Sequence, residues 1–428
     1  MPRRRVWILV FLFLLATINY VDRVALSVAA APISAELGID KVQLGYLFSS
    51  FLWLYVVCLV PMGWLVDRLG TRAVNAGGMA LWSAATVATG MVASLPALIA
   101  TRVVMGIGEA TTYPAAGRVI REWVPARERA LATTIFNAGA YFGPAVGGLV
   151  LASLVASAGW RAAFYACGAI GFIWLAAWLI WFRQPEEARW LSEEERRMVL
   201  RERAGTQASG GEPAMGVLQL LRAPAMIGMM LTQGCAVYTQ YLFLTWLPNY
   251  LQTERGMTML KSGAVMVLPY LGAVVITIIL GRISDALLTP QAVADGRRRT
   301  MVVATMLCAA VILAVPFVNN VVLVLLLIMV ALGGVASAVG LNISLLNDLL
   351  RSAPDTGRAT GLLILGGNVF GILAPVVTGY AVEATGGFNA AFVIAGLLLV
   401  CGALASFLLA RKPIEPAGAV ALAQARPV

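Results

Sequence analysis

The sequence predicts an all-α membrane protein in which twelve transmembrane helices form two pseudo-symmetric six-helix bundles. Of its 428 residues, 60% are hydrophobic and 12% are charged, whereas soluble domains are closer to half apolar and a quarter charged. Apolar runs of about 20 residues recur along the chain, and each is long enough to cross a bilayer core of about 30 Å. Because lipid offers no hydrogen bonds to the backbone, these runs are expected to be helices.

Twelve runs define the expected spans. They cover residues 6–30, 43–66, 73–93, 96–121, 130–155, 161–183, 224–250, 260–284, 299–318, 321–349, 357–381 and 388–410. A stretch rich in charges, Pro and Gly separates the sixth from the seventh, and we expect an amphipathic helix over 191–203 within it. The predicted organisation is a bundle over 1–183, a linker over 184–223, a second bundle over 224–411 and a tail over 412–428.

The net charge of +10 indicates orientation and does not predict nucleic-acid binding. With a cytoplasmic N-terminus, most Lys and Arg residues fall in cytoplasmic segments, and four fall outside: Lys41, Arg161, Arg255 and Lys261. This asymmetry is the positive-inside pattern. We therefore expect a multi-pass protein of a bacterial-type inner membrane, with both termini in the cytoplasm and no nucleic-acid partner.

Short motifs repeat in the two halves. "GWLVDRLGTR" (63–72) follows the second span, and "GRISD" (281–285) follows the eighth. "PARERA" (125–130) follows the fourth span, and "PDTGRA" (354–359) follows the tenth. Equivalent loops in two six-helix halves indicate duplication, which is typical of transporters whose substrate site lies between the halves.

The loop after the second span resembles the signature of the major facilitator superfamily. The matching residues are Gly63, Asp67, Arg68, Gly70 and Arg72. The glycines suit a tight turn, and the charges can cap a helix end or pair across the cytoplasmic face. We therefore expect these residues, together with Asp285 of the second copy, to act in conformational gating. The resemblance implies the major facilitator fold.

Four ionisable residues lie within predicted spans, where each charge costs about 2.5–3.5 kcal/mol on insertion scales. They are Asp22 and Arg23 in the first span and Arg102 and Glu109 in the fourth. Helix neighbours at i and i+1 point about 100° apart, so Asp22 and Arg23 are not expected to neutralise each other. Arg102 and Glu109 are two turns apart and share a face. We expect both helices to turn these groups toward a shared cavity.

Three segments narrow the resemblance. "NYVDR" (19–23), "RVVMGIGEA" (102–110) and "RERALATTIFNAG" (127–139) together resemble the anion:cation symporter family. This family contains bacterial hexuronate, galactonate and glucarate carriers, as well as sialin and the vesicular glutamate transporters. The resemblance implies a secondary active transporter that takes up an organic anion together with protons by alternating access.

The resemblance also implies roles for individual residues. Arg23 and Arg102 would hold the substrate carboxylate, Asp22 and Glu109 would exchange protons, and Tyr20 and Tyr55 would line the cavity. Arginine suits this role because it stays charged and its planar fork fits a carboxylate. Two arginines and two carboxylates sum to zero, so adding a monoanion and one proton leaves the site neutral. A static ion-pair network between the two helices is the alternative.

Other polar residues are candidates for reading substrate hydroxyl groups, foremost Asn137 and Asn368. Helix–helix hydrogen bonds are the alternative for each of them and for the remaining polar positions. These are Gln233, Tyr238, Gln240, Asn342 and Asn347. Ala140 stands where sugar-acid carriers of this family tend to have an amide. An aromatic or short organic acid is therefore an alternative to a sugar acid.

Two other functions stay open. "GAYFGPAVGG" (139–148) resembles the signature of proton-coupled drug exporters, although small residues at this spacing also allow close helix packing. A non-transporting nutrient sensor is the second alternative. Histidine is absent, and no nucleophile–base pair or metal-binding cluster is apparent. We therefore expect no enzyme, cofactor or metal site, but a monomer with a small organic anion, lipid and protons as partners. Carboxylates alone do not discriminate protons from sodium.

Overall fold

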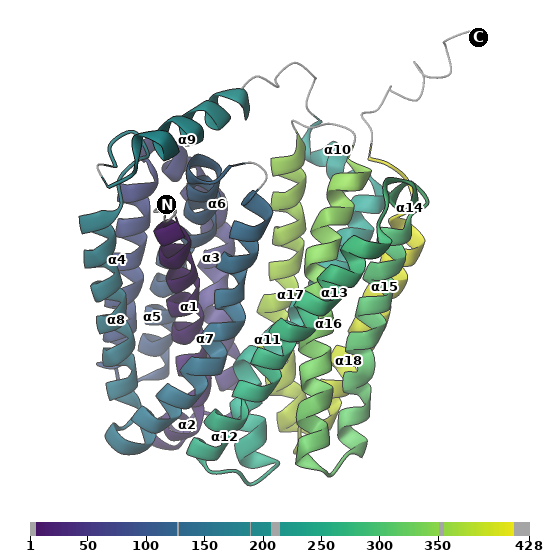
Figure 1. The fold of residues 1–428 in the computed structure, drawn as a ribbon. Coiled ribbons are helices and arrows are strands. Elements are labelled where there is room, and N and C mark those ends of the chain that lie inside the picture. Colours follow the sequence, from purple (N-terminus) through teal and green to yellow (C-terminus); the bar gives the residue numbers. More distant parts are fainter. Residues whose placement is uncertain (1–5, 126–127, 189, 207–214, 351–354, 415–428) are drawn as a thin grey trace. The chain divides into compact units, whose positions relative to one another are not determined.

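A computed structural model describes residues 6–125, 128–188, 190–206, 215–350 and 355–414, and these are almost entirely helical (Figure 1). The chain divides into two compact units. Unit 1 comprises Met1–Ser209 and Leu244–Leu271, and unit 2 comprises Gly210–Phe243 and Gly272–Val428. The end of α11, all of α12 and the start of α13 thus belong to unit 1.

Unit 1 contains the first nine helices. They are α1 (Val6–Val28), α2 (Ala30–Leu37), α3 (Lys41–Leu69), α4 (Thr71–Thr89), α5 (Leu95–Glu109), α6 (Thr112–Trp123), α7 (Arg129–Ala158), α8 (Trp160–Trp181) and α9 (Glu193–Thr206). The last of these is the helix expected within the linker. Helix α1 packs mainly along α7, while α5 packs against α3 and α4.

The remaining elements lie wholly or partly in unit 2, except α12, which belongs to unit 1. They are α10 (Val217–Arg222), α11 (Pro224–Thr253), α12 (Met259–Val265), α13 (Val267–Leu287), α14 (Pro290–Ala294), α15 (Arg297–Ala309), the 3₁₀ helix η2 (Ala310–Phe317), α16 (Val321–Leu349), α17 (Thr356–Thr385) and α18 (Asn389–Leu409). Helix α15 continues directly into η2, and α18 packs against both.

The helices confirm the predicted fold class. In the described part of the chain, nine spans are long and apolar enough to cross a membrane. The other three expected spans correspond to α4, to the pair α5 and α6, and to α11. Each of the twelve apolar runs thus forms either one helix or two consecutive helical segments.

Three expected spans are interrupted where the sequence analysis predicted one continuous helix. The breaks separate α1 from α2, α5 from α6, and α12 from α13. In each case the third residue of the second helix is a proline: Pro32, Pro114 and Pro269. Proline lacks an N–H group and clashes with the carbonyl four residues earlier, which here lies at the break, but it is tolerated in a first helical turn. The second break directly follows Glu109.

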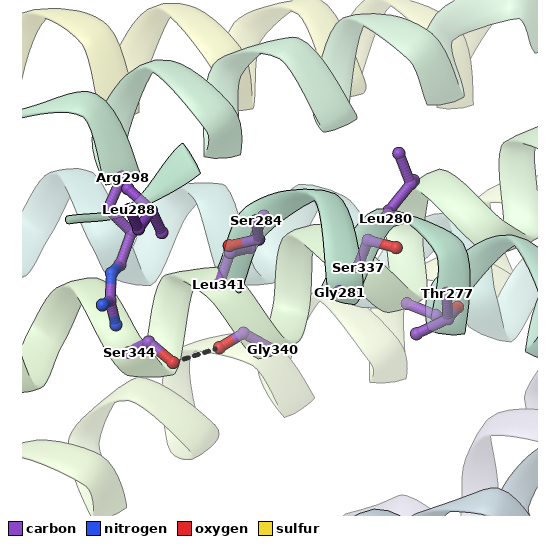
Figure 2. A pocket seen from close by; sticks show the side chains of 11 residues that line it. Thr277, Leu280, Gly281, Ser284, Leu288, Arg298, Ser337, Gly340, Leu341 and Ser344 are labelled. Atoms are coloured by element: carbon purple, nitrogen blue, oxygen red, sulfur yellow. Dashed lines mark hydrogen bonds between the residues drawn. The ribbon is translucent and has the colours of Figure 1, made fainter. Parts of the chain in front are cut away.

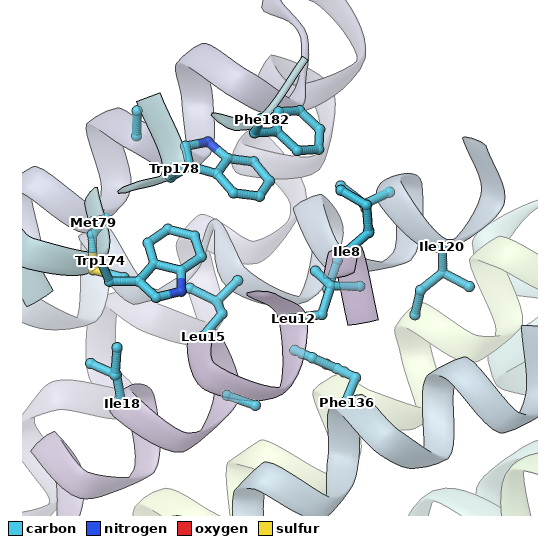
Figure 3. Close-up of a cluster of buried hydrophobic side chains, with 14 of the residues drawn as sticks. Ile8, Leu12, Leu15, Ile18, Met79, Ile120, Phe136, Trp174, Trp178 and Phe182 are labelled. Carbon is cyan, nitrogen blue, oxygen red and sulfur yellow. The ribbon is translucent and has the colours of Figure 1, made fainter. Parts of the chain in front are cut away.

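Tryptophan side chains form much of the core of unit 1 (Figure 3). Trp174 and Trp178 of α8 stack with ring centroids 5.1 Å apart, and Trp178 stacks on Phe182 at 3.8 Å. The ring of Phe11 in α1 packs edge-to-face with that of Trp174, with the two ring centroids 6.0 Å apart. Aromatic rings bury large apolar areas in specific geometries, so this stack holds α1 against α8.

Candidate functional site

Glycines allow the helices that carry the ionisable residues to pack closely. A Cβ atom on Gly106 of α5 would lie 2.0 Å from the carbonyl oxygen of Phe51 in α3. A Cβ atom on Gly143 of α7 would lie 2.7 Å from the carbonyl oxygen of Thr17 in α1. Both distances are shorter than real Cβ contacts. The absence of a side chain at these positions therefore sets how near α5 comes to α3 and α7 to α1.

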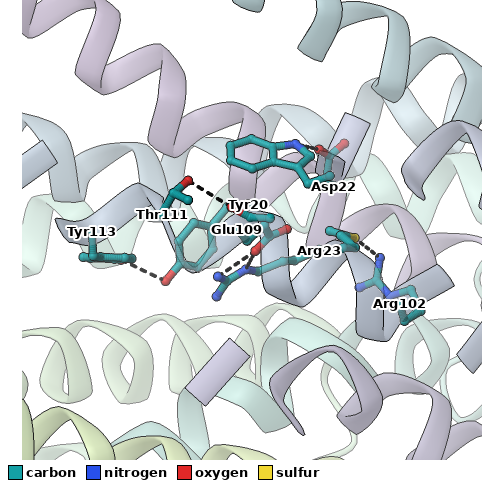
Figure 4. Close-up of polar contacts among 10 residues, drawn as sticks. Tyr20, Asp22, Arg23, Arg102, Glu109, Thr111 and Tyr113 are labelled. Atoms are coloured by element: carbon teal, nitrogen blue, oxygen red, sulfur yellow. Dashed lines mark hydrogen bonds and ion pairs between the residues drawn. The ribbon is translucent and has the colours of Figure 1, made fainter. Parts of the chain in front are cut away.

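Arg23 and Glu109 form a buried ion pair (Figure 4). Glu109 Oε2 lies 2.8 Å from Arg23 Nη2 and accepts a hydrogen bond from Arg23 Nε at 2.9 Å. The side chains are 3% and 0% exposed. The Arg23 guanidinium also lies 4.8 Å from the ring centroid of Tyr20, 4.7 Å from that of Phe51 and 5.1 Å from that of Tyr55. The negative faces of these aromatic rings attract the cation and so stabilise the buried charge of Arg23.

Asp22, the neighbour of Arg23, has a different partner. Its Oδ2 atom accepts a hydrogen bond from the indole Nε1 of Trp82 at 3.0 Å (Figure 4), and the residue is 1% exposed. The thiol of Cys167 interacts with the same carboxyl group. Adjacent residues on a helix point in different directions, and here one faces α4 while the other reaches Glu109 of α5.

Arg102 is buried, and no carboxylate of a described residue is in direct contact with it. It is 2% exposed, its Nη1 atom lies 2.9 Å from the sulfur of Met105, and its Nε atom makes no hydrogen bond to a described residue. Its guanidinium lies 5.7 Å from the ring centroid of Phe51, so both arginines lie against this ring. Arg102 interacts electrostatically with Glu109 and Asp22. The four ionisable residues thus form one cluster in unit 1.

Of the tyrosines and amides that were expected to line a substrate site, only the tyrosines lie beside the ionisable residues. Tyr20 and Tyr55 lie against Arg23, and the Tyr20 hydroxyl is 3.4 Å from that of Tyr113. Asn137 is exposed on α7. Asn368 belongs to unit 2, where its amide donates to the carbonyl of residue 364 at 3.0 Å. The tyrosines therefore join the arginine cluster, whereas neither amide shares a described contact with it.

The turn between α3 and α4 carries part of the predicted gating motif. Gly70 has φ +82°, a conformation that glycine adopts without strain. Asp67 lies 3.5 Å from Nη1 of Arg118 in α6. Arg118 also donates to the carbonyl of Val66 and pairs with Glu122 at 2.7 Å. The basic partner of Asp67 thus comes from α6, outside the motif.

The other residues of this motif have separate contacts. The guanidinium of Arg68 lies over the ring of Trp64 at 4.4 Å, and Arg72 donates to a backbone carbonyl of α8 at 2.6 Å. A Cβ atom at Gly63 would make only an ordinary contact at 3.9 Å, so packing does not require glycine there. Asp285 belongs to α13, but its side chain lies outside the described part of the structure.

The glycines of the exporter-like segment serve close packing. Gly143 meets α1, and Gly147 would place a Cβ atom 3.1 Å from the side chain of Val21. On α12, a Cβ atom at Gly263 would lie 2.5 Å from the carbonyl oxygen of Gly148. These contacts give the spacing a packing role that does not depend on export.

Two pairs of polar side chains in unit 2 join neighbouring helices. Asn342 of α16 donates to the Gln233 side chain at 3.0 Å and to a carbonyl of α11 at 3.0 Å. Arg298 pairs with Asp348 at 2.9 Å, beside a pocket of about 330 Å³ between α13 and α16 (Figure 2). Thr277 and Ser284 are among its lining residues. These contacts stabilise helix pairs, and the Arg298 cation at the pocket already has a carboxylate partner.

Three neighbours of the ionisable cluster were missed by the sequence analysis: Phe51, Trp82 and Tyr113. No charge or repeat marks them, and they come from three different helices, α3, α4 and α6. Of the three, only Phe51 could have been predicted from the sequence. It precedes Tyr55 by one helical turn, so the two rings lie on one face of α3, 5.9 Å apart.

Comparison with known proteins agrees with this architecture. The chain matches the Major Facilitator Superfamily over residues 12–294 and 291–427. It is 32% identical to the probable galactarate/D-glucarate transporter GudP of Bacillus subtilis, over 96% of this chain and 92% of that protein. It is also 32% identical to the D-galactonate transporter of Escherichia coli O6:H1 (95% and 96% covered) and 31% identical to the probable sulfoacetate transporter SauU of Cupriavidus necator (98% of both).

Solved structures share the fold at lower identity. The inward-open xylose transporter XylE from Escherichia coli superimposes with a TM-score of 0.75 at 14% identity, over 97% of this chain and 99% of that one. A bacterial homologue of the human lysosomal transporter Spinster gives a TM-score of 0.72 at 19% identity, over 96% and 98%. Together, the family match, the relatives and the helical architecture show that the chain belongs to the Major Facilitator Superfamily.

Proposed function

We propose that this protein takes up an organic anion together with protons, by alternating access, across a bacterial inner membrane with both termini in the cytoplasm. Its family and its curated relatives are transporters, so the chain is a transporter and not an enzyme. The relatives are named for galactarate, D-glucarate, D-galactonate and sulfoacetate, and all of these are organic anions. This common chemistry supports an anionic substrate here.

The observation that carries the proposal is the uneven pairing of the two buried arginines. Arg23 is bound to Glu109 at 2.8 Å, whereas Arg102 has no described carboxylate in contact and leaves its Nε atom without a hydrogen bond. A buried guanidinium without a paired anion is costly. A substrate carboxylate would supply that anion and could form two parallel hydrogen bonds with the planar fork.

The two acidic groups are suited to carry the coupling protons. Protonation of Glu109 would remove the charge that holds Arg23 and allow this second guanidinium to turn to the anion. Asp22 accepts one hydrogen bond from Trp82, and its other oxygen makes none of normal geometry with the described residues. With one anion and one proton bound, the four groups and their ligands would be neutral overall. A carrier whose occupied site is neutral can switch between its outward-facing and inward-facing conformations at low electrostatic cost.

The substrate is most simply a small organic carboxylate. A sugar acid, an aromatic acid and a short organic acid all satisfy the arginine cluster. Export of small molecules is the alternative direction, but no contact among the described residues favours it, because the exporter-like glycines of α7 are used for packing. Sodium is the alternative coupling ion.

Uptake by purified protein in liposomes tests the proposal. With D-galactonate as the probe, an inward proton gradient should drive accumulation, and a protonophore should abolish it. The Glu109→Gln variant should lose this accumulation but retain exchange of labelled for unlabelled substrate, because exchange needs no net proton movement. Accumulation driven by a sodium gradient and indifferent to pH would contradict proton coupling. A thermal-shift panel of carboxylates at two pH values identifies the substrate, since a ligand stabilises the folded state it binds.

A further inference from the structure

Tyr270, near the start of α13, has a buried hydroxyl group that makes no hydrogen bond within the described part of the chain. The residue is 3% exposed, and its hydroxyl oxygen has no hydrogen-bond partner among the described residues. A buried polar atom without a partner destabilises the fold, and phenylalanine would fill nearly the same volume without this cost. The hydroxyl therefore requires a partner that the described residues do not provide.

The neighbours of Tyr270 connect it to the arginine cluster. Tyr270 belongs to unit 1 and lies near Tyr141 of α7 and Tyr20 of α1. The Tyr20 hydroxyl lies 3.4 Å from that of Tyr113 (Figure 4), and the Tyr20 ring centroid lies 4.8 Å from the Arg23 guanidinium. We name Tyr20, Tyr113, Tyr141 and Tyr270 the tyrosine cluster. It brings together phenol groups from four helices, and Tyr20 connects them to Arg23.

We propose that Tyr270 is a specificity-determining residue, whose hydroxyl binds a hydroxyl group of the substrate while the arginines hold the carboxylate. The inference rests on the proposed function and narrows it to a hydroxylated carboxylate. A phenol is both a donor and an acceptor, so it can pair with an alcohol in either direction. This assigns hydroxyl recognition to phenols instead of amides. It agrees with Ala140 preceding Tyr141 in α7, with the exposure of Asn137 and with the hydrogen bond of Asn368 to its own helix.

An unhydroxylated acid would not explain the same arrangement. Its carbon chain would lie against the Tyr270 hydroxyl and leave that group without a partner in the bound state as well. A site built to bind a hydroxyl group discriminates strongly against an analogue that lacks it, because the polar group of the protein is then left unpaired. The tyrosine cluster should therefore favour D-galactonate over hexanoate, since both are six-carbon monocarboxylates and only the first carries hydroxyl groups.

The test compares Tyr270→Phe with Tyr165→Phe in the purified full-length protein. Tyr165 is the matched control because its hydroxyl donates to the carbonyl of Gly90 at 2.9 Å and lies outside the tyrosine cluster. Affinities for D-galactonate and hexanoate are measured by isothermal titration, and melting temperatures are measured without ligand. Tyr270→Phe should weaken D-galactonate binding about 3- to 10-fold, leave hexanoate binding unchanged, and keep or raise the ligand-free melting temperature.

The control should show the opposite pattern. Tyr165→Phe should lower the melting temperature and leave the ratio of the two affinities unchanged, because it removes a satisfied hydrogen bond away from the cluster. An equal loss of both affinities in Tyr270→Phe, or no loss, would overturn the proposal. Wild-type protein that binds hexanoate as tightly as D-galactonate would overturn the role of Tyr270 but leave the carboxylate site standing. Wild-type protein that binds neither would contradict the proposed function as well.

Discussion

Replacing Gly106 by alanine should disturb the contact that brings α5 against α3. An ideal Cβ atom at this position lies 2.0 Å from the carbonyl oxygen of Phe51, 3.1 Å from its carbonyl carbon and 3.4 Å from the backbone nitrogen of Tyr55. All three atoms are backbone, so no side-chain rotation relieves the overlap, and one helix must move by about 1 Å to reach normal contact. Overpacking of this kind costs about 1–3 kcal/mol.

The displacement should also reach the ionisable residues, because Arg102 lies on the preceding turn of α5 and Glu109 on the following one. We therefore expect Gly106→Ala to lower both the melting temperature in detergent and the affinity for D-galactonate. Gly117→Ala is the matched control, since its Cβ atom would meet nothing within 4 Å. Alanine is favoured over glycine within a helix by about 1 kcal/mol, so this variant should melt at the same or a higher temperature. A Gly106→Ala protein as stable as Gly117→Ala would refute the close contact.

Three further variants test individual contacts. Arg102→Lys should weaken D-galactonate binding by roughly 10-fold or more in isothermal titration, because an ammonium lacks the planar fork; unchanged affinity would remove Arg102 as a carboxylate ligand. Glu109→Gln leaves the Arg23 charge buried and should lower the free energy of unfolding by up to about 3–5 kcal/mol, and an unaltered melting temperature would contradict the ion pair. The Arg161 guanidinium donates hydrogen bonds to Glu36 and lowers its pKa from 4.5 to about 2. A carboxyl group with a lowered pKa stabilises the fold while it is ionised. Wild-type protein should therefore lose stability as the pH falls from 4.5 toward 2. If the melting temperatures of wild type and Glu36→Gln fall equally over that range, Glu36 does not make this contribution.

The fold was predictable because hydrophobic run length and motif repetition survive in a single sequence. Each expected span corresponds to helical structure, and the superfamily resemblance is confirmed by the family match. Run length does not report where a helix breaks. Pro32, Pro114 and Pro269 interrupt expected spans, whereas Pro61 and Pro144 lie within continuous helices. Whether a proline breaks a helix depends on the packing around it, and this packing cannot be read from the sequence.

The ionisable members of the site were predictable for a different reason. A charge within an apolar run is conspicuous, so Asp22, Arg23, Arg102 and Glu109 stand out in the sequence itself. Their pairing does not follow from helical spacing, which places Arg102 and Glu109 on one face and says nothing of the partner helix. The uncharged partners are still harder to predict, because a tryptophan such as Trp82 is an ordinary residue for a membrane helix until α4 is placed beside α1.

The position of Phe51 suggests how two arginines can share one anion without first repelling each other. Its ring centroid lies 4.7 Å from the Arg23 guanidinium and 5.7 Å from that of Arg102, so one aromatic ring contacts both cations. Like charges at short range in a medium of low dielectric constant repel strongly, and the negative face of a ring offsets part of that repulsion. Glu109 offsets more of it, but only while it is ionised. In the proposed mechanism, this arrangement would couple the proton to the anion, because a neutral Glu109 would leave the cluster with excess positive charge that a carboxylate is best placed to balance.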